Sequence, residues 1–241
     1  MDLLIEAIAW LTDGANWEGP SSVPARLWEH VWLTVVVMVI ACAVAIPIGL
    51  WLGHIGRGGT LAINISNVGR AVPTLAILVL LVLGPTGLSI WSTIIALVLF
   101  AIPPILTNTY VGTRDVSRDA VEAARGMGMS GPQLLSKVEL PLAVPLIMSG
   151  IRLSSVQVVA TATIAALVAG PGLGRIITAG FARLDYPQMV AGAFLVAIVA
   201  LAVEVGMEWV QRRADPMREA YRADSGAVMD ESVHVDARHR S

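Results

Sequence analysis

The sequence is poor in charge, in cysteine and in lysine. Only 14% of its 241 residues are charged and 56% are hydrophobic, whereas soluble domains carry roughly 25% charged residues, so the composition is that of a membrane protein. Its one cysteine, Cys42, excludes an internal disulfide and is interpreted as a small packing residue within an apolar run. Lys137 is the single lysine, and no Lys/Arg-rich run predicts a nucleic-acid partner.

Two further features are missing. The phosphate-binding pattern GxxxxGK[ST] does not occur, so ATP hydrolysis by this chain is not expected. Residues 1–27 lack the basic start of a secretory signal, because their first charges are Asp2 and Glu6. The apolar part of this segment is shorter than the about 20 residues that a crossing needs. We therefore expect residues 1–27 to be an extracytoplasmic segment that can lie on the membrane surface.

Long runs without Asp, Glu, Lys or Arg indicate where the chain crosses the membrane. Residues 71–113 form one such run, whose length requires two crossings separated by the Gly84-Pro85-Thr86-Gly87 turn. Charge-free runs at 31–53, 153–174 and 186–203 indicate three more crossings. The sequence predicts an all-α integral membrane domain over residues 28–210, with five spans at 31–53, 65–83, 88–110, 141–169 and 188–210.

The distribution of basic residues predicts the orientation. With the first span starting outside, all of the 16 Lys and Arg residues except Arg26, Arg175 and Arg183 fall on the cytoplasmic side. The N-terminus is therefore expected outside and the C-terminus inside. Residues 211–241 would be a cytoplasmic tail, expected to be disordered because it is polar and poor in aromatic residues.

The cytoplasmic loop 114–140 carries signals for two short helices of its own. Ser117 can cap a first helix, which Gly128 helps to end. Ser130 and Gln133 have the capping-box spacing and predict a second helix that ends where Leu140-Pro141 re-enters lipid. A helix–turn–helix elbow with a small, partly apolar face fits insertion into a groove on a partner. The alternative is an ordinary long loop that is capped for stability.

The loop resembles the EAA-loop signature of bacterial ABC importer permeases. Glu122-Ala123-Ala124, then Gly128, then Val138-Glu139-Leu140-Pro141 match it, with Val138 in place of the usual isoleucine. The resemblance extends over about residues 27–210. Three more segments are similar to the osmoprotectant branch of these permeases: Arg70–Ala76, Ile102–Tyr110 and Gly170–Gly174. Methionine-type permeases share the five-span core.

This resemblance implies a five-span MetI-like permease bundle whose elbow is a coupling helix docked in the cleft of an ATPase. The partners would be a pair of ATP-binding subunits, a second permease of the same or a similar chain, an extracytoplasmic substrate-binding protein and membrane lipid. No cofactor is expected in this chain, since ATP and Mg would be bound by the ATPase. The location would be the inner membrane of a prokaryote. The implied coupling residues are Glu122, Ala123, Ala124, Gly128, Leu140 and Pro141.

Polar residues inside the predicted spans are candidates for a translocation path. They are Asn108, Gln157, Thr161 and Thr163, each of which could instead form a hydrogen bond between helices. Arg152 is expected to snorkel or to form an ion pair, and Glu208 can pair with Arg212. The spans hold few aromatic residues for a quaternary-ammonium cage, so we expect selectivity to reside in the separate binding protein.

The sequence therefore predicts the permease subunit of an ATP-driven importer for glycine betaine, choline, carnitine or proline. One alternative is a methionine-type or other small-solute ABC permease. An ion-driven secondary transporter is a different class, and five spans without a visible inverted repeat argue against it. A structural membrane adaptor is the third class.

Overall fold

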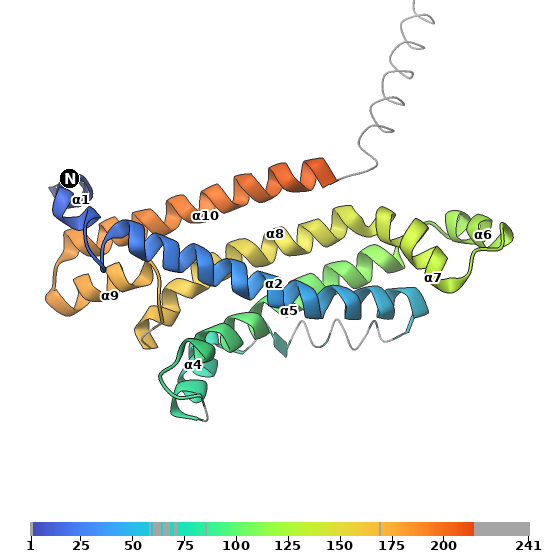
Figure 1. Ribbon diagram of the computed structural model, residues 1–241, viewed down its shortest axis with the longest axis horizontal. Coiled ribbons are helices and arrows are strands. Elements are labelled where there is room, and N and C mark those ends of the chain that lie inside the picture. The colour runs from blue at the N-terminus through green and yellow to red at the C-terminus, as the bar shows by residue number, and fades with distance from the viewer. Residues whose placement is uncertain are drawn as a thin grey trace, which may run out of the picture.

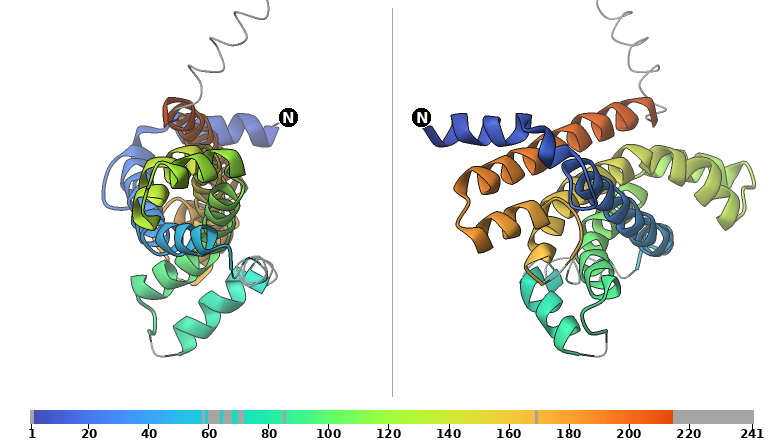
Figure 2. Two further views of the ribbon diagram at one scale, coloured as in Figure 1. Left: turned by 90° about the vertical axis from the view of Figure 1, so that its right-hand side faces the viewer. Right: turned by 60° about the vertical axis from the view of Figure 1, so that its left-hand side comes forward.

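The computed structural model describes residues 2–57, 59, 64, 68–69, 72–84, 86–168 and 170–214, and every regular element within them is a helix. Long helices run lengthwise, with α1 and α9 at one end of the molecule and α6 and α7 at the other (Figure 1; Figure 2, right). The elements in chain order are α1 (Asp2–Thr12), η1 (Gly14–Trp17), α2 (Val23–Ile55), α4 (Thr74–Leu83), α5 (Ile90–Arg114), α6 (Arg118–Gly126), α7 (Gly131–Leu134), η2 (Leu135–Glu139), α8 (Leu140–Ala165), η3 (Ala166–Val168), α9 (Gly174–Arg183) and α10 (Tyr186–Ala214).

Four helical stretches in the described residues are long and apolar enough to cross a membrane. They are α2, α5, the continuous stretch 131–168 and α10. The predicted span 65–83 falls partly outside the described residues, and its described helix, α4, has 10 residues. A helix of that length is about 15 Å long, too short to cross a bilayer by itself.

The long helices extend beyond the predicted spans. α2 begins at Val23 rather than residue 31, because the Ser22 hydroxyl accepts a hydrogen bond from the Ala25 N–H at 3.4 Å and Pro24 occupies the first turn. α10 runs to Ala214, so residues 211–214 of the predicted disordered tail are helical. The rest of that tail lies outside the described residues.

The short helix α9 was not predicted, because its basic residues place it outside the apolar runs. A turn that includes Gly172, within the segment similar to osmoprotectant permeases, joins it to α8. The Gly172 N–H donates to Glu29 Oε2 at 2.9 Å, and the Leu173 N–H donates to His30 Nδ1 at 3.3 Å. The other ring nitrogen of the fully buried His30 donates to the Val159 carbonyl at 3.1 Å. These bonds attach the turn to α2 and α8.

The core lies where α2, α5 and α8 pack together. It is built from Leu33, Val37, Met38, Ala41, Ala45, Ile94, Leu97, Ala101, Ile105, Leu106, Val158 and Ala162. Glycines let the backbones approach closely: a Cβ on Gly49 would lie 2.7 Å from the Thr109 Cβ, and one on Gly53 would lie 2.5 Å from the Thr113 Cβ. Small residues at helix contacts are the expected solution in lipid, where apolar surface alone does not drive helices together.

This close contact predicts that Gly53→Ala destabilises the protein. The added methyl group would force α2 away from α5 at a cost of about 1–3 kcal/mol, which lowers the melting temperature in detergent by roughly 5 °C. The matched control is Gly206→Ala on α10, where a Cβ meets nothing within 4 Å. Equal melting temperatures for the two variants would contradict the packing argument.

Candidate functional site

The elbow lies at one end of the bundle and begins with the capped helix α6. The Ser117 hydroxyl accepts a hydrogen bond from the Ala120 N–H at 3.2 Å, as the sequence predicts. Asp119 in the first turn and Arg125 in the last turn both interact favourably with the helix dipole. The chain reverses at Gly128, whose φ of +82° suits glycine. Figure 1 shows α6 and α7 side by side at this tip.

The second helix of the elbow differs from the prediction. The Gln133 side chain accepts a hydrogen bond from the Ser130 N–H at 2.9 Å, and the Ser130 side chain faces the Gln133 backbone N–H, so the predicted capping box is present. However, α7 does not end before the membrane, because the π-helical turn η2 joins it directly to α8. Pro141 has no N–H with which to continue the regular hydrogen-bond pattern. The wider π-helical turn before it, in which the Leu140 N–H donates to the Leu135 carbonyl, accommodates the proline.

The signature residues divide into exposed and inward-facing groups. Glu122, Ala123 and Gly128 are exposed at the tip, whereas Ala124 is only 2% exposed and faces the protein interior. Leu140 and Pro141 are half-buried at the start of α8. Met127 is 73% exposed and adds an apolar side chain to the tip. The part of the elbow available to a partner is therefore α6 and the reversal after it.

A half-buried pair that sequence reasoning missed fastens the elbow to α2. His54 Nδ1 donates to Glu139 Oε2 at 2.6 Å, and the Glu139 side chain is 7% exposed. The imidazole also lies near Gly131, the first residue of α7. His54 is separated from Glu139 by 85 residues, so no local pattern indicates the pair. A polar residue in the last turn of a long apolar helix was the available signal.

A cleft of about 600 Å³ opens between this pair and α6. Arg114, Arg118 and Arg125 line it together with Glu122, so that a carboxylate of the signature shares the cleft with three guanidinium groups. Guanidinium groups bind carboxylates and phosphates through paired hydrogen bonds. Because Asp115 and Glu139 line the cleft as well, the arrangement offers a polar surface of mixed charge beside the exposed tip.

The four candidates for the translocation path do not form one cluster. The Asn108 amide donates to the Pro104 carbonyl at 2.8 Å where α5 meets Gly150 of α8. Thr161 is 8% exposed, and the Thr163 hydroxyl donates to a carbonyl of its own helix. Gln157 lines a cavity of about 280 Å³ between α8 and α10.

That cavity also holds an ion pair within the predicted spans. Arg152 Nε donates to Glu204 Oε1 at 2.8 Å, which confirms that Arg152 pairs across helices. Gln211 donates to the Ser149 hydroxyl at 2.9 Å and accepts from Arg152 at 3.4 Å. On the exposed side of α10, Arg212 forms the predicted pair with Glu208. Glu204 thus neutralises a charge rather than standing alone in the membrane region.

The long apolar helices, with the capped elbow at one end of the bundle, are those of a multi-pass membrane protein. Residues 45–217 match the family described as "Binding-protein-dependent transport system inner membrane component". The chain belongs to this family and is a permease subunit of an ABC transport system. Members of the family are transport subunits, and the chain is not an enzyme.

Curated relatives and solved structures agree with this assignment. The carnitine transport permease protein OpuCB of Listeria monocytogenes is 37% identical, covering 81% of this chain and 90% of its own. The osmoprotectant import permease protein OsmY of Salmonella typhimurium is 36% identical, covering 78% and 80%. The MetNI methionine ABC transporter in an inward-facing conformation gives a TM-score of 0.69 at 21% identity, covering 80% and 95%, and so shows the fold.

We expect the His54–Glu139 pair to be strongly coupled. In a double-mutant cycle of His54→Ala and Glu139→Ala, melting in detergent should give an interaction energy of about 1–3 kcal/mol, because either single change leaves a polar group unpaired. The exposed Glu208–Arg212 pair is the control and should give less than about 1 kcal/mol. Additive effects of the first two changes would show that the pair does not hold the elbow.

Proposed function

We propose that the chain is the membrane subunit of an ATP-driven importer for osmoprotectants of the glycine betaine, carnitine, choline or proline type. Support comes from relatives named for carnitine, choline and glycine betaine, which are 31–37% identical over most of the chain. A methionine-type permease is the second candidate, favoured by the MetNI fold, but at 21% identity that likeness concerns the backbone arrangement.

In this proposal the elbow receives force from an ATPase that is a separate chain binding ATP and Mg. The observation that carries it is the exposed tip of α6, in which Glu122 and Ala123 face away from the bundle while Ala124 and the His54–Glu139 pair hold the tip in place. Movement of the ATPase against such a fixed tip is transmitted to the helices rather than absorbed by a slack loop. Gly128, Leu140 and Pro141 shape the two ends of this surface.

The proposed assembly contains two ATP-binding subunits, this permease with a second copy or a related permease, and an extracytoplasmic binding protein. We place the N-terminus and α9 outside and the elbow inside a prokaryotic inner membrane, because Arg and Lys concentrate at the elbow side. Residues 1–27 are then extracytoplasmic, 28–210 form the transmembrane domain with five crossings, and 114–140 form the coupling loop. Asn108, Gln157, Thr161 and Thr163 are the proposed path residues, with Gln157 foremost because it lines a cavity.

Uptake into vesicles tests the proposal. Vesicles that contain the permease and its ATPase should accumulate glycine betaine only with internal ATP and with binding protein outside. Uptake driven by an ion gradient without ATP would assign the chain to the secondary transporters. Failure to transport any of the named solutes under all of these conditions would assign it to the structural adaptors. Accumulation of methionine in place of glycine betaine would favour the second candidate.

Reversal of one charge at the tip should abolish uptake. We expect Glu122→Arg to lower ATP-dependent uptake by more than about tenfold, because a reversed charge at the centre of a docking surface costs about 2 kcal/mol or more. Glu6→Arg is the matched control, since it makes the same change on an exposed residue of α1 at the other end. Expression and membrane insertion are measured for both. Normal uptake by Glu122→Arg would overturn the docking of this tip.

A further inference from the structure

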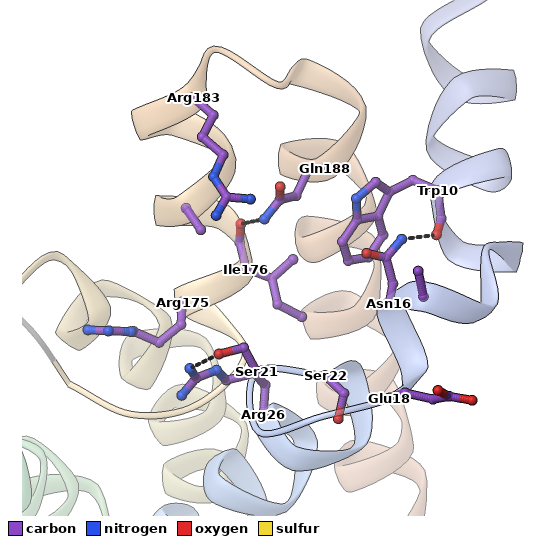
Figure 3. Close-up of a pocket in the computed structure, with 12 residues that line it drawn as sticks. Trp10, Asn16, Glu18, Ser21, Ser22, Arg26, Arg175, Ile176, Arg183 and Gln188 are labelled. Carbon is purple, nitrogen blue, oxygen red and sulfur yellow. Dashed lines mark hydrogen bonds between the residues drawn. The ribbon is translucent and has the colours of Figure 1, made fainter.

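A second cavity lies at the end of the molecule opposite the elbow, and we call it the distal cavity. It has a volume of about 340 Å³ and is walled by α1, η1, the start of α2, α9 and the start of α10. Figure 3 shows this site in close-up. Its volume falls at the lower end of the range for small-molecule sites, which is about 300–1,000 Å³. The elbow does not reach it, so the coupling mechanism leaves it unexplained.

One side of the distal cavity carries three cationic groups. Arg26, Arg175 and Arg183 all line it, and they are the same three residues that the sequence separates from the remaining basic residues. Arg26 is held by Glu29, at 2.9 Å and 3.1 Å from the two carboxylate oxygens. Neither Arg175 nor Arg183 forms an ion pair within the part of the chain that the structure describes. Both guanidinium groups are therefore unpaired among the described residues, and Figure 3 shows that of Arg183 turned toward the cavity and that of Arg175 extending away from it.

The other side of the distal cavity suits a cationic group. Figure 3 shows the three arginines on one side and Trp10, Asn16 and Glu18 on the other. The Asn16 amide donates to the Trp10 carbonyl at 2.8 Å, and Trp10 packs against the small core cluster that includes Ile176. The face of an indole ring attracts a cation, whereas Figure 3 shows the Glu18 carboxylate directed away from Trp10. The cavity therefore has a positive side and a cation-accepting side.

We propose that the distal cavity binds a small zwitterion, with its carboxylate toward Arg183, its ammonium group toward Trp10, and Arg175 adding positive charge at the rim. The class of solute is taken from the proposed function, on which this inference rests, and the cavity narrows it to solutes that carry both charges. Glycine betaine, carnitine and proline carry both charges, whereas choline has no carboxylate and should bind poorly. The cavity would hold the solute on the extracytoplasmic side, ahead of the membrane path. Because the site opens to solvent and the solute is small, we expect a dissociation constant on the order of 1 mM.

Ligand-observed NMR titration of the purified permease in detergent, without ATPase or binding protein, tests this site. Glycine betaine should bind, whereas choline and acetate, which each carry one of its two charges, should bind at least about tenfold more weakly. The Arg175→Gln/Arg183→Gln variant should lose at least about tenfold in glycine betaine affinity. The matched control is Arg114→Gln/Arg118→Gln in the cleft of the elbow, which should leave that affinity unchanged.

Additional variants separate loss of the site from loss of the fold. Arg175→Lys/Arg183→Lys keeps both charges and should retain more affinity than the glutamine variant, and Trp10→Leu should weaken glycine betaine more than acetate. Melting temperatures identify any misfolded variant. Equal binding of choline and glycine betaine would overturn the proposal. Unchanged glycine betaine affinity in the glutamine variant would also overturn it. In a separate assay with added binding protein, a variant that binds glycine betaine normally and loses only its association with that protein would overturn it too.

The titration tests the distal site and the uptake assay tests the proposed function, so each proposal can be overturned without the other. An absence of ATP-dependent uptake by the wild-type protein would overturn the proposed function, even where glycine betaine binds the distal cavity. An absence of glycine betaine binding to the isolated permease would overturn the distal site and leave the importer assignment in place.

Discussion

The contact between α2 and α5 through glycine is the constraint on which the rest of the structure depends. In a bilayer the surrounding lipid is as apolar as the helices, so close backbone packing must supply much of the attraction. Gly49 and Gly53 face Thr109 and Thr113 with no room for another methyl group. His54 follows directly in the chain, so this helix contact also places the imidazole that holds Glu139. Neighbouring residues of α2 therefore determine both the packing of the core and the position of the elbow.

Charged groups in the bundle are accommodated by pairing across helices. Arg152 and Glu204 join α8 to α10, His54 and Glu139 join α2 to η2, and Glu29 caps the turn before α9 through the Gly172 N–H. Each pair joins residues at least 52 positions apart in sequence. Such pairs satisfy groups that would otherwise be costly away from water, and at the same time specify which helices are neighbours.

Local signals in the sequence predicted the parts of the fold that local chemistry determines. Ser117 and Ser130 lie at helix starts as expected, because a cap depends on residues within one turn. The charge-free runs 31–53 and 186–203 lie within α2 and α10, whereas the run 71–113 covers α4 as well as most of α5, and the run 153–174 continues past the end of α8. The start of α2 at Val23 and the helix α9 were missed, because charge was treated as the limit of a helix although Arg26 and Glu29 pair within one. The His54–Glu139 pair and the distal cavity depend on contacts between distant segments, which spacing along the chain does not encode.

The continuity of α7 with α8 has a mechanical consequence. A helical stretch of 38 residues is about 57 Å long, and this one starts beside the exposed tip and ends a few residues before the turn at Gly172. Its π-helical turn widens the rod without interrupting it. If the elbow receives force as proposed, a helix that packs against α5 would act as a lever, and a tilt at the elbow would become a displacement of the opposite sense at the far end. The turn at Gly172, the helix α9 that follows it and the walls of the distal cavity lie at that end of the lever.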